Sequence, residues 1–198
     1  MNIGIEVNGV LRDTLGKIEQ IYTRWYAEPF ELIEDKTNLF EYKIHEPIDS
    51  LNIAKHFPFP NDEDLYNFLY VEHPMEIFGH SGSVEFTSMN DLNDLYYDLR
   101  DNHNIKIISD EIGKSKPATL FFLSKYGCLI EDIIFYSEQT INKIWDNVDV
   151  LLTANPTIIE KAPKNKTVIK YNTKYNNSIT TKFSIEKLKE LPTFLENL

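Results

Sequence analysis

Residues 1–13 read MNIGIEVNGVLRD, and the interpretation of the whole chain starts from them. Alternating apolar residues predict a short strand: Ile3, Ile5 and Val7. The Asn8-Gly9 dipeptide is a turn signal at the end of that strand. Apolar residues then recur at spacings of three and four, which predicts a helix directly after the turn: Leu11, Leu15, Ile18, Tyr22 and Trp25. A simple hairpin would need a second alternating strand here, and the helical spacing disfavours it. A strand, a tight loop and a helix form the arrangement at which open α/β sheets bind ligands.

The string IEVNGVLRD, which begins at Ile5, resembles the first motif of haloacid dehalogenase-like (HAD) hydrolases, an apolar strand followed by D-x-D-G. The resemblance implies that the first motif aspartate is a nucleophile and that the second is a general acid and base. In this chain the first position holds Glu6 and the second holds Asn8. Both catalytic aspartates of the motif are therefore replaced.

The resemblance also implies an α/β fold with a Rossmann-like core, in which helices flank a parallel sheet. We assign residues 1–27 and 84–198 to this core and residues 28–83 to a small, mostly helical cap inserted after the first helix. The inserted segment contains five prolines, many aromatic residues and one convincing helix over 62–72, opened by Asn61 and Asp64 as a capping pair. Caps in this family sit over the active site and select the substrate.

Two further family motifs have matches after the cap. A buried apolar strand over 105–108 ends in Ser109. The resemblance gives this hydroxyl the role of hydrogen-bonding a phosphoryl group. A lysine at the start of the next helix is the third motif, for which we choose Lys116 and keep Lys114 in reserve. Strands often end in serine and lysines are common near helix starts, so both assignments compete with a purely structural role.

The fourth family motif places aspartates after a further strand, where they hold magnesium. The strand predicted over 133–136 is followed by Glu138 and Asn142 at the matching positions. The implied metal ligands are thus Glu6, Asn8, Glu138 and Asn142. This set predicts a weak or absent Mg²⁺ site, because an amide supplies no charge to an ion that prefers carboxylate, phosphate and water ligands. We expect Mg²⁺ as a cofactor only if the protein is an active enzyme.

The remaining elements are a helix over 89–102 opened by a capping box of Ser88 and Asp91, a strand over 148–152, an edge strand over 167–171 and a closing helix over 184–195. The segment DVLLTANP is similar to nucleotidase-like branches of the family, including phage-encoded ones.

Composition indicates a soluble globular protein of 198 residues, 42% of them hydrophobic. Cys128 is the only cysteine, so an intrachain disulfide is excluded and a reducing compartment is expected. The first residues lack a secretion signal and no apolar run is long enough to span a membrane, so we predict a cytoplasmic protein that does not bind membranes. A net charge of -11 argues against a nucleic-acid polymer as partner.

The charge is unevenly distributed along the chain. Residues 28–101 contain 17 acidic and 4 basic residues, whereas residues 161–189 contain 8 lysines and one acid. The two regions are either solvated faces or complementary patches through which the chain docks on a second copy or on another protein.

Glutamate and asparagine in place of the two motif aspartates impair nucleophilic attack and proton transfer but keep both positions polar. Glu6 retains a carboxylate on a side chain one methylene longer, a displacement of roughly 1 Å that can cost about a hundredfold in an in-line attack. Asn8 cannot transfer a proton, and positioned acid–base catalysis contributes on the order of 10² to 10⁴ in rate. An anion cradle could persist in the groups that remain: Ser109, Lys116 and the backbone amides around Asn8 to Val10.

Three functional hypotheses follow. The first is a nucleotidase-related pseudo-phosphatase that binds a small phosphorylated ligand, such as a nucleotide, or a protein partner. The second is an active Mg²⁺-dependent phosphatase on nucleoside monophosphates. The third is a structural or assembly module.

Overall fold

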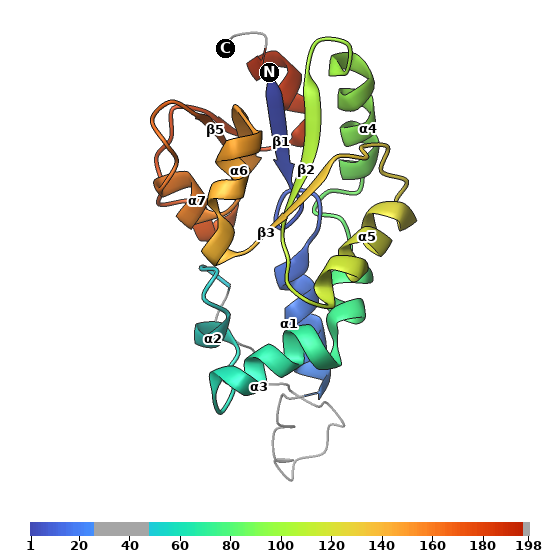
Figure 1. Ribbon diagram of the computed structural model, residues 1–198. Coiled ribbons are helices and arrows are strands. Elements are labelled where there is room, and N and C mark those ends of the chain that lie inside the picture. The colour runs from blue at the N-terminus through green and yellow to red at the C-terminus, as the bar shows by residue number, and fades with distance from the viewer. Residues whose placement is uncertain (26–47, 196–198) are drawn as a thin grey trace, which may run out of the picture.

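A parallel β-sheet lies at the centre of the computed structural model, which describes residues 1–25 and 48–195 (Figure 1). Within these residues six strands pair in the order β3-β2-β1-β4-β5-β6, and every pairing is parallel. The strands are β1 Asn2–Glu6, β2 Asn104–Asp110, β3 Ile133–Tyr136, β4 Val150–Thr153, β5 Thr167–Tyr171 and β6 Ser184–Ile185. The predicted α/β fold with a parallel sheet is confirmed.

The central position of β1 determines which residues can meet at the site. β1 lies between β2 and β4, with Glu6 opposite Ile108 and Ile5 opposite Leu152. Parallel strands end at the same edge of a sheet, so the residues that follow Ile108 and Leu152 lie beside Glu6. β3 is separated from β1 by β2.

Helices cover both faces of the sheet, as in other doubly wound folds (Figure 1). On one face α4, α5 and α8 pack against the apolar residues of β1 and β2, and on the other α6 and α7 pack against Leu151 of β4. The helices of the core are α1 Thr14–Trp25, α4 Ser88–Leu99, α5 Ser115–Lys125, α6 Asn142–Asn147, α7 Pro156–Glu160 and α8 Leu191–Leu195, with 3₁₀ turns at Glu138–Thr140, Lys174–Asn176 and Leu188–Glu190. No described helix has the length and apolar character needed to cross a membrane.

Residues 48–83, here called the cap segment, are the described part of the predicted cap. They form α2 Ile53–His56, α3 Asp62–Asn67 and two π-helical turns, Phe68–Glu72 and Met75–Gly79. Asn61 accepts a hydrogen bond from the amide of Asp64, as the predicted capping pair requires. Ile18 and Tyr22 of α1 share an apolar cluster with Phe57, Phe68 and Phe78 of the cap segment. The cap boundaries at 28 and 83 stay predictions, since residues 28–47 lie outside the described residues.

Two helix starts differ from the predicted ones. The amides of Leu11 and Arg12 both donate to the Val7 carbonyl, so a tight turn occupies these positions and α1 begins only at Thr14. The predicted capping box of Ser88 and Asp91 is wrong by one residue. The Ser88 hydroxyl accepts from the Glu85 amide, and Thr87 donates to Asp91 instead.

The predicted helix over 184–195 and the edge position of 167–171 are also wrong. Ser184 and Ile185 form β6 and pair with β5, which is therefore not an edge strand. Pro192 limits the helix to α8, because a proline in the interior of a longer helix removes a hydrogen bond and clashes with the preceding turn.

Arg12 connects the loop after β1 to three other parts of the chain. Its side chain is fully buried, and each of its five guanidinium N–H groups has a partner. Nη1 donates to the Phe78 carbonyl at 2.7 Å and to Thr119 Oγ1 at 2.6 Å, and Nε donates to Thr14 Oγ1 at 3.0 Å. Nη2 donates to Asn8 Oδ1 at 2.7 Å and forms an ion pair with Glu111, which follows β2. One cation thus fixes the loop against β2, α5 and the cap segment.

We expect Arg12→Met to lower the free energy of unfolding by about 3–5 kcal/mol, because it leaves the Glu111 carboxylate buried without a counter-charge. Urea denaturation measures this loss, and Arg12→Met with Glu111→Gln should recover part of it. Arg24→Met is the matched control, since the Arg24–Glu76 pair has 49% and 32% of its side chains exposed. The control should lose about 1 kcal/mol or less. An equal loss in both arginine variants would contradict the proposed role of the buried pair.

Candidate functional site

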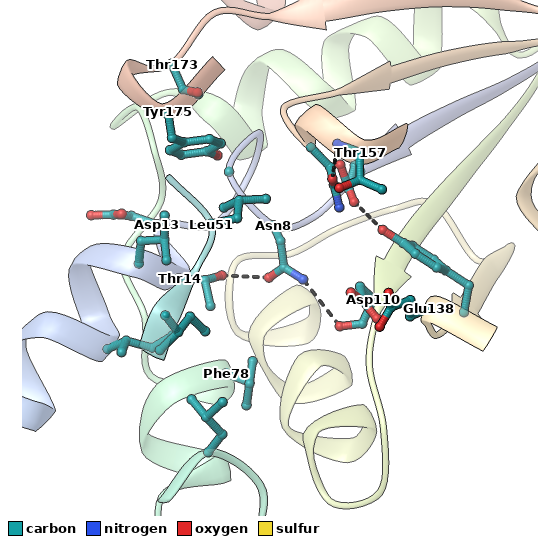
Figure 2. A pocket seen from close by; sticks show the side chains of 18 of the residues that line it. Asn8, Asp13, Thr14, Leu51, Phe78, Asp110, Glu138, Thr157, Thr173 and Tyr175 are labelled. Atoms are coloured by element: carbon teal, nitrogen blue, oxygen red, sulfur yellow. Dashed lines mark hydrogen bonds between the residues drawn. The ribbon is translucent and has the colours of Figure 1, made fainter. Parts of the chain in front are cut away.

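A cavity of about 460 Å³ lies at the carboxyl ends of the central strands, between the core and the cap segment. Glu6, Asn8 and Asp110 line it from the core, and Leu69 and Phe78 line it from the cap segment. Figure 2 shows Asn8 near the middle of this pocket, Phe78 below it and Tyr175 above it. The cavity therefore occupies the position that the first sequence motif predicts.

Glu6, at the motif's nucleophile position, is almost fully buried, with 1% of its surface exposed. The Tyr136 hydroxyl donates to its Oε1 at 2.6 Å, and the Thr153 hydroxyl donates to its Oε2. Thr153 reaches Glu6 because β4 is paired with β1. Each carboxyl oxygen therefore has a neutral donor, and neither has a cation among the described residues.

Burial raises the pKa of Glu6 from 4.5 to about 7, although the hydrogen bonds from Thr153 and Tyr136 act in the opposite direction. The negative charge of Asp110 raises it further. The raised pKa favours the protonated form of Glu6 near neutral pH, and a protonated carboxyl is a poor nucleophile.

Asn8, at the acid–base position, is held in one orientation. Its Oδ1 accepts hydrogen bonds from Arg12 at 2.7 Å and from Thr14 Oγ1 at 2.6 Å. Its Nδ2 donates to the Asp110 carbonyl at 3.4 Å, and Figure 2 shows the contacts with Thr14 and Asp110. An amide satisfies donors on one side and an acceptor on the other, which a carboxylate could not do.

Asp110 and Glu138 form an acidic wall of the cavity (Figure 2). Burial raises the pKa of Asp110 to about 6, and the charges of Glu111 and Glu138 add to that rise. Asp13 also lines the cavity, whereas none of the described residues that line it is a lysine, arginine or histidine. The polar end of the cavity is thus acidic.

The structure does not bring three of the sequence-predicted site residues into the cavity. Ser109 is fully buried and donates to Glu111 at 3.2 Å, since its side chain points into the Arg12 network. Lys116 is exposed near the start of α5, with its Nζ 5.9 Å from the centre of the Phe135 ring. Asn142 is exposed at the start of α6. Lys114, the reserve choice, is exposed as well.

Of the two residues predicted from the fourth motif, Glu138 lines the cavity with Glu6 and Asn142 does not. Glu138 follows β3, which does not pair with β1. The strand on the other side of β1 is β4, and Asn155 after β4 lines the cavity. Asn155 Oδ1 accepts from the amides of Thr157 and Ile158 and so caps α7.

The residues present do not fit a magnesium ion. No group of three or more His, Cys, Asp or Glu side chains within residues 1–25 and 48–195 is arranged to hold a metal. The oxygens of Glu6 and Asn8 already accept hydrogen bonds, and Asn142 lies outside the cavity. Magnesium prefers several oxygen ligands in octahedral geometry, which this arrangement does not offer.

Sequence reasoning missed several residues that shape the site: Arg12, Asp110, Glu111, Tyr136, Thr153, Asn155 and Tyr175. Asp110 and Thr153 could have been found, since both stand at the ends of predicted apolar strands. Tyr175 could not, because it reaches the cavity from a distant 3₁₀ turn. Its hydroxyl would lie 2.0 Å from a Cβ on Gly9, whose φ of 76° also favours glycine.

Comparison with known proteins identifies the fold. Neither a protein-family model nor a curated protein sequence matches the chain. Solved structures do match it at low identity. A haloacid dehalogenase-like hydrolase from Burkholderia xenovorans LB400 has a TM-score of 0.55 at 12% identity, with 98% of this chain and 96% of that chain covered. The HAD-hydrolase YfnB from Bacillus subtilis, bound to magnesium, has a TM-score of 0.56 at 12% identity, with 98% of each chain covered.

A dehalogenase solved with an intermediate complex has a TM-score of 0.54 at 12% identity, with 98% of this chain and 96% of that chain covered. This chain therefore has the fold of HAD-like hydrolases, as the sequence resemblance implied. The nucleotidase branch and a phage source stay predictions.

Glu6 gives the chain a pH-dependent stability. A folded-state pKa of about 7 lies above the ordinary value of 4.5, so the free energy of unfolding should fall as pH rises between these values. The fall attributable to Glu6 is about 3 kcal/mol. Glu6→Gln should remove this part of the pH dependence in urea denaturation at pH 5 and pH 8. The exposed Glu131→Gln is the control and should behave as wild type. A wild-type stability that rises over this range would contradict the assignment.

Proposed function

We propose that this chain is an HAD-fold protein that has lost phosphoryl transfer and retains its cavity as a ligand-binding site. The observation that carries the proposal is that the side chains at both motif positions already accept hydrogen bonds from neighbouring protein groups. Hydroxyl groups hold Glu6, and Arg12 and Thr14 hold Asn8. Neither side chain is arranged for the step that its position performs in the motif.

The chemical argument concerns both halves of a phosphoryl transfer. A carboxylate nucleophile needs an ionised oxygen free to approach phosphorus, whereas Glu6 has a pKa of about 7 and a donor on each oxygen. A leaving group or attacking water then needs a proton carrier, and the Asn8 amide does not titrate. Adjusting one position alone therefore leaves the other defect in place.

A phosphorylated ligand, such as a nucleotide, is the class that the sequence resemblance implies. The geometry gives it little support, because the described lining residues include four acids and no cation. The Gly9 amide donates to the Arg12 carbonyl at 2.9 Å, so it is not available for an anion. A phosphate group would therefore have to enter the cavity together with a bound cation.

An active Mg²⁺-dependent phosphatase is the second candidate. The observation in its favour is that Asp110 and Glu138 line the cavity together with Glu6, which supplies three carboxylates near one wall. The following two experiments separate this candidate from the first.

We expect the wild-type protein to release no phosphate above background from a panel of deoxynucleoside monophosphates and phenyl phosphate with Mg²⁺ at pH 7. Malachite-green detection over several hours sets the limit, and Glu6→Gln is measured beside it. Background release by both proteins supports the proposal. Mg²⁺-dependent release that Glu6→Gln abolishes would establish the second candidate instead.

We expect Mg²⁺ at millimolar concentration to leave the wild-type melting temperature unchanged. A variant with Glu6→Asp, Asn8→Asp and Asn155→Asp places carboxylates at the ends of the adjacent strands β1 and β4, and we expect Mg²⁺ to stabilise it. An aspartate at 155 can still cap α7. The matched control exchanges Asn155→Asp for Asn142→Asp, which lies outside the cavity and should add nothing. Equal Mg²⁺ stabilisation of both triple variants would contradict this assignment of the metal positions.

A further inference from the structure

The loop after β1 contains the dipeptide Asn8-Gly9, which is the only Asn-Gly pair in the sequence. In a flexible chain this pair deamidates readily, because glycine has no side chain to hinder attack by its own backbone nitrogen. The glycine nitrogen bonds to Cγ of the asparagine and loses its proton, the Cγ–Nδ2 bond breaks, and the side-chain amide leaves as ammonia. One water molecule then opens the succinimide ring to give aspartate or isoaspartate.

The fold holds both reacting groups in hydrogen bonds. The Gly9 amide donates to the Arg12 carbonyl at 2.9 Å, so attack by this nitrogen requires that bond to break. Asn8 Oδ1 accepts from Arg12 at 2.7 Å and from Thr14 at 2.6 Å, and Nδ2 donates to the Asp110 carbonyl at 3.4 Å (Figure 2). Intramolecular reactions depend on the alignment of the reacting atoms. Four hydrogen bonds therefore oppose the rotations that close the ring.

Gly9 has little freedom to rotate by itself. Its φ of 76° lies in the left-handed region, and the Tyr175 hydroxyl covers its α-carbon so closely that an added Cβ would lie 2.0 Å away. The turn also includes Arg12, whose guanidinium donates to the Phe78 carbonyl of the cap segment and to Thr119 of α5. Release of the Gly9 nitrogen thus requires a local opening that disturbs the contacts of Arg12.

We propose that Asn8 is a deamidation site that the hydrogen bonds of Arg12 keep unreacted while the loop after β1 is closed. Opening of the loop releases the Gly9 nitrogen, and the reaction then proceeds. Asn8 lines the cavity, which gives water access to the succinimide. The acidic product accumulates in chains whose loop has opened. This inference is independent of what the cavity binds.

The reaction makes a reversible opening permanent. Aspartate at position 8 has no Nδ2 donor for the Asp110 carbonyl, and it places a second carboxylate beside Arg12, which already pairs with Glu111. Isoaspartate runs the backbone through the former side chain and adds one carbon to the tight turn. Neither product restores the hydrogen bonds of the closed loop, so deamidation alters the floor of the cavity.

A second asparagine in the chain supplies an internal reference. Asn177 precedes Ser178, and both residues are exposed. The serine side chain hinders attack by its backbone nitrogen, so this pair is intrinsically less reactive than Asn8-Gly9. In the full chain unfolded in guanidinium chloride we expect Asn8 to deamidate faster than Asn177. In the native chain at the same pH we expect the order to reverse.

The experiment incubates both samples at pH 7.5, digests them at acidic pH and measures each asparagine and its two products by liquid chromatography and mass spectrometry. Thr14→Val removes one hydrogen bond to Asn8 and one acceptor of Arg12. It should raise the rate at Asn8 about tenfold in the native chain, because modification of an open form follows its population. Arg12→Met should raise the rate further, and Thr14→Val carries the test if that variant does not fold.

Asn93→Ala is the control for general destabilisation. Asn93 bonds to the Gly127 carbonyl and the Leu129 amide, both remote from Asn8 in the sequence, and its removal should leave the rate at Asn8 unchanged. Native Asn8 that reacts as fast as in the unfolded chain, or Asn8 that stays unreacted in guanidinium chloride, would overturn the inference. So would a wild-type rate in Thr14→Val or an equal increase in Asn93→Ala. Phosphate release tests the proposed function separately.

Discussion

The buried guanidinium of Arg12 is the interaction on which the site depends. A charge of this size is stable in the interior only when it is paired and all its donors are satisfied, and here five acceptors from separate parts of the chain meet that condition. The same contacts hold the loop after β1, the carbonyl of Phe78 in the cap segment and Thr119 of α5. The geometry of the cavity floor is therefore coupled to the position of the segment that covers it.

Arg12 also explains why an amide at position 8 is stable. Arg12 already has a carboxylate partner in Glu111, so a second carboxylate at position 8 would place two negative charges around one cation. The Asn8 amide accepts from Arg12 and Thr14 without adding charge, and its Nδ2 donates to the Asp110 carbonyl. The loss of proton transfer and the stability of the loop thus have the same physical origin.

The sequence predicted the sheet and the position of the site because those features depend on local patterns. Alternation in residues 2–7 and the turn at Asn8-Gly9 are sufficient to place Glu6 and Asn8 at the end of a strand that leads into a helix. The fourth motif was only partly located, with Glu138 in the cavity and Asn142 outside it, because strand order is not local. Glu138 follows the right kind of strand, but that strand pairs with β2 and not with β1. Ser109 failed for a similar reason, since the direction of its side chain depends on Glu111 and Arg12.

The identity of the residue after β4 illustrates how one fold can support different chemistry. Every chain with this strand order brings the ends of β1 and β4 together. The side chain that follows β4 therefore lines the same cavity as Glu6. Here Asn155 caps α7 with its amide oxygen and contributes no charge to the cavity. Asparagine and aspartate are comparable helix caps, so the helix tolerates either residue. The charge available to a bound ion or ligand can therefore change at this position at little cost to the fold, and the chemistry of the cavity has to be derived from its own side chains.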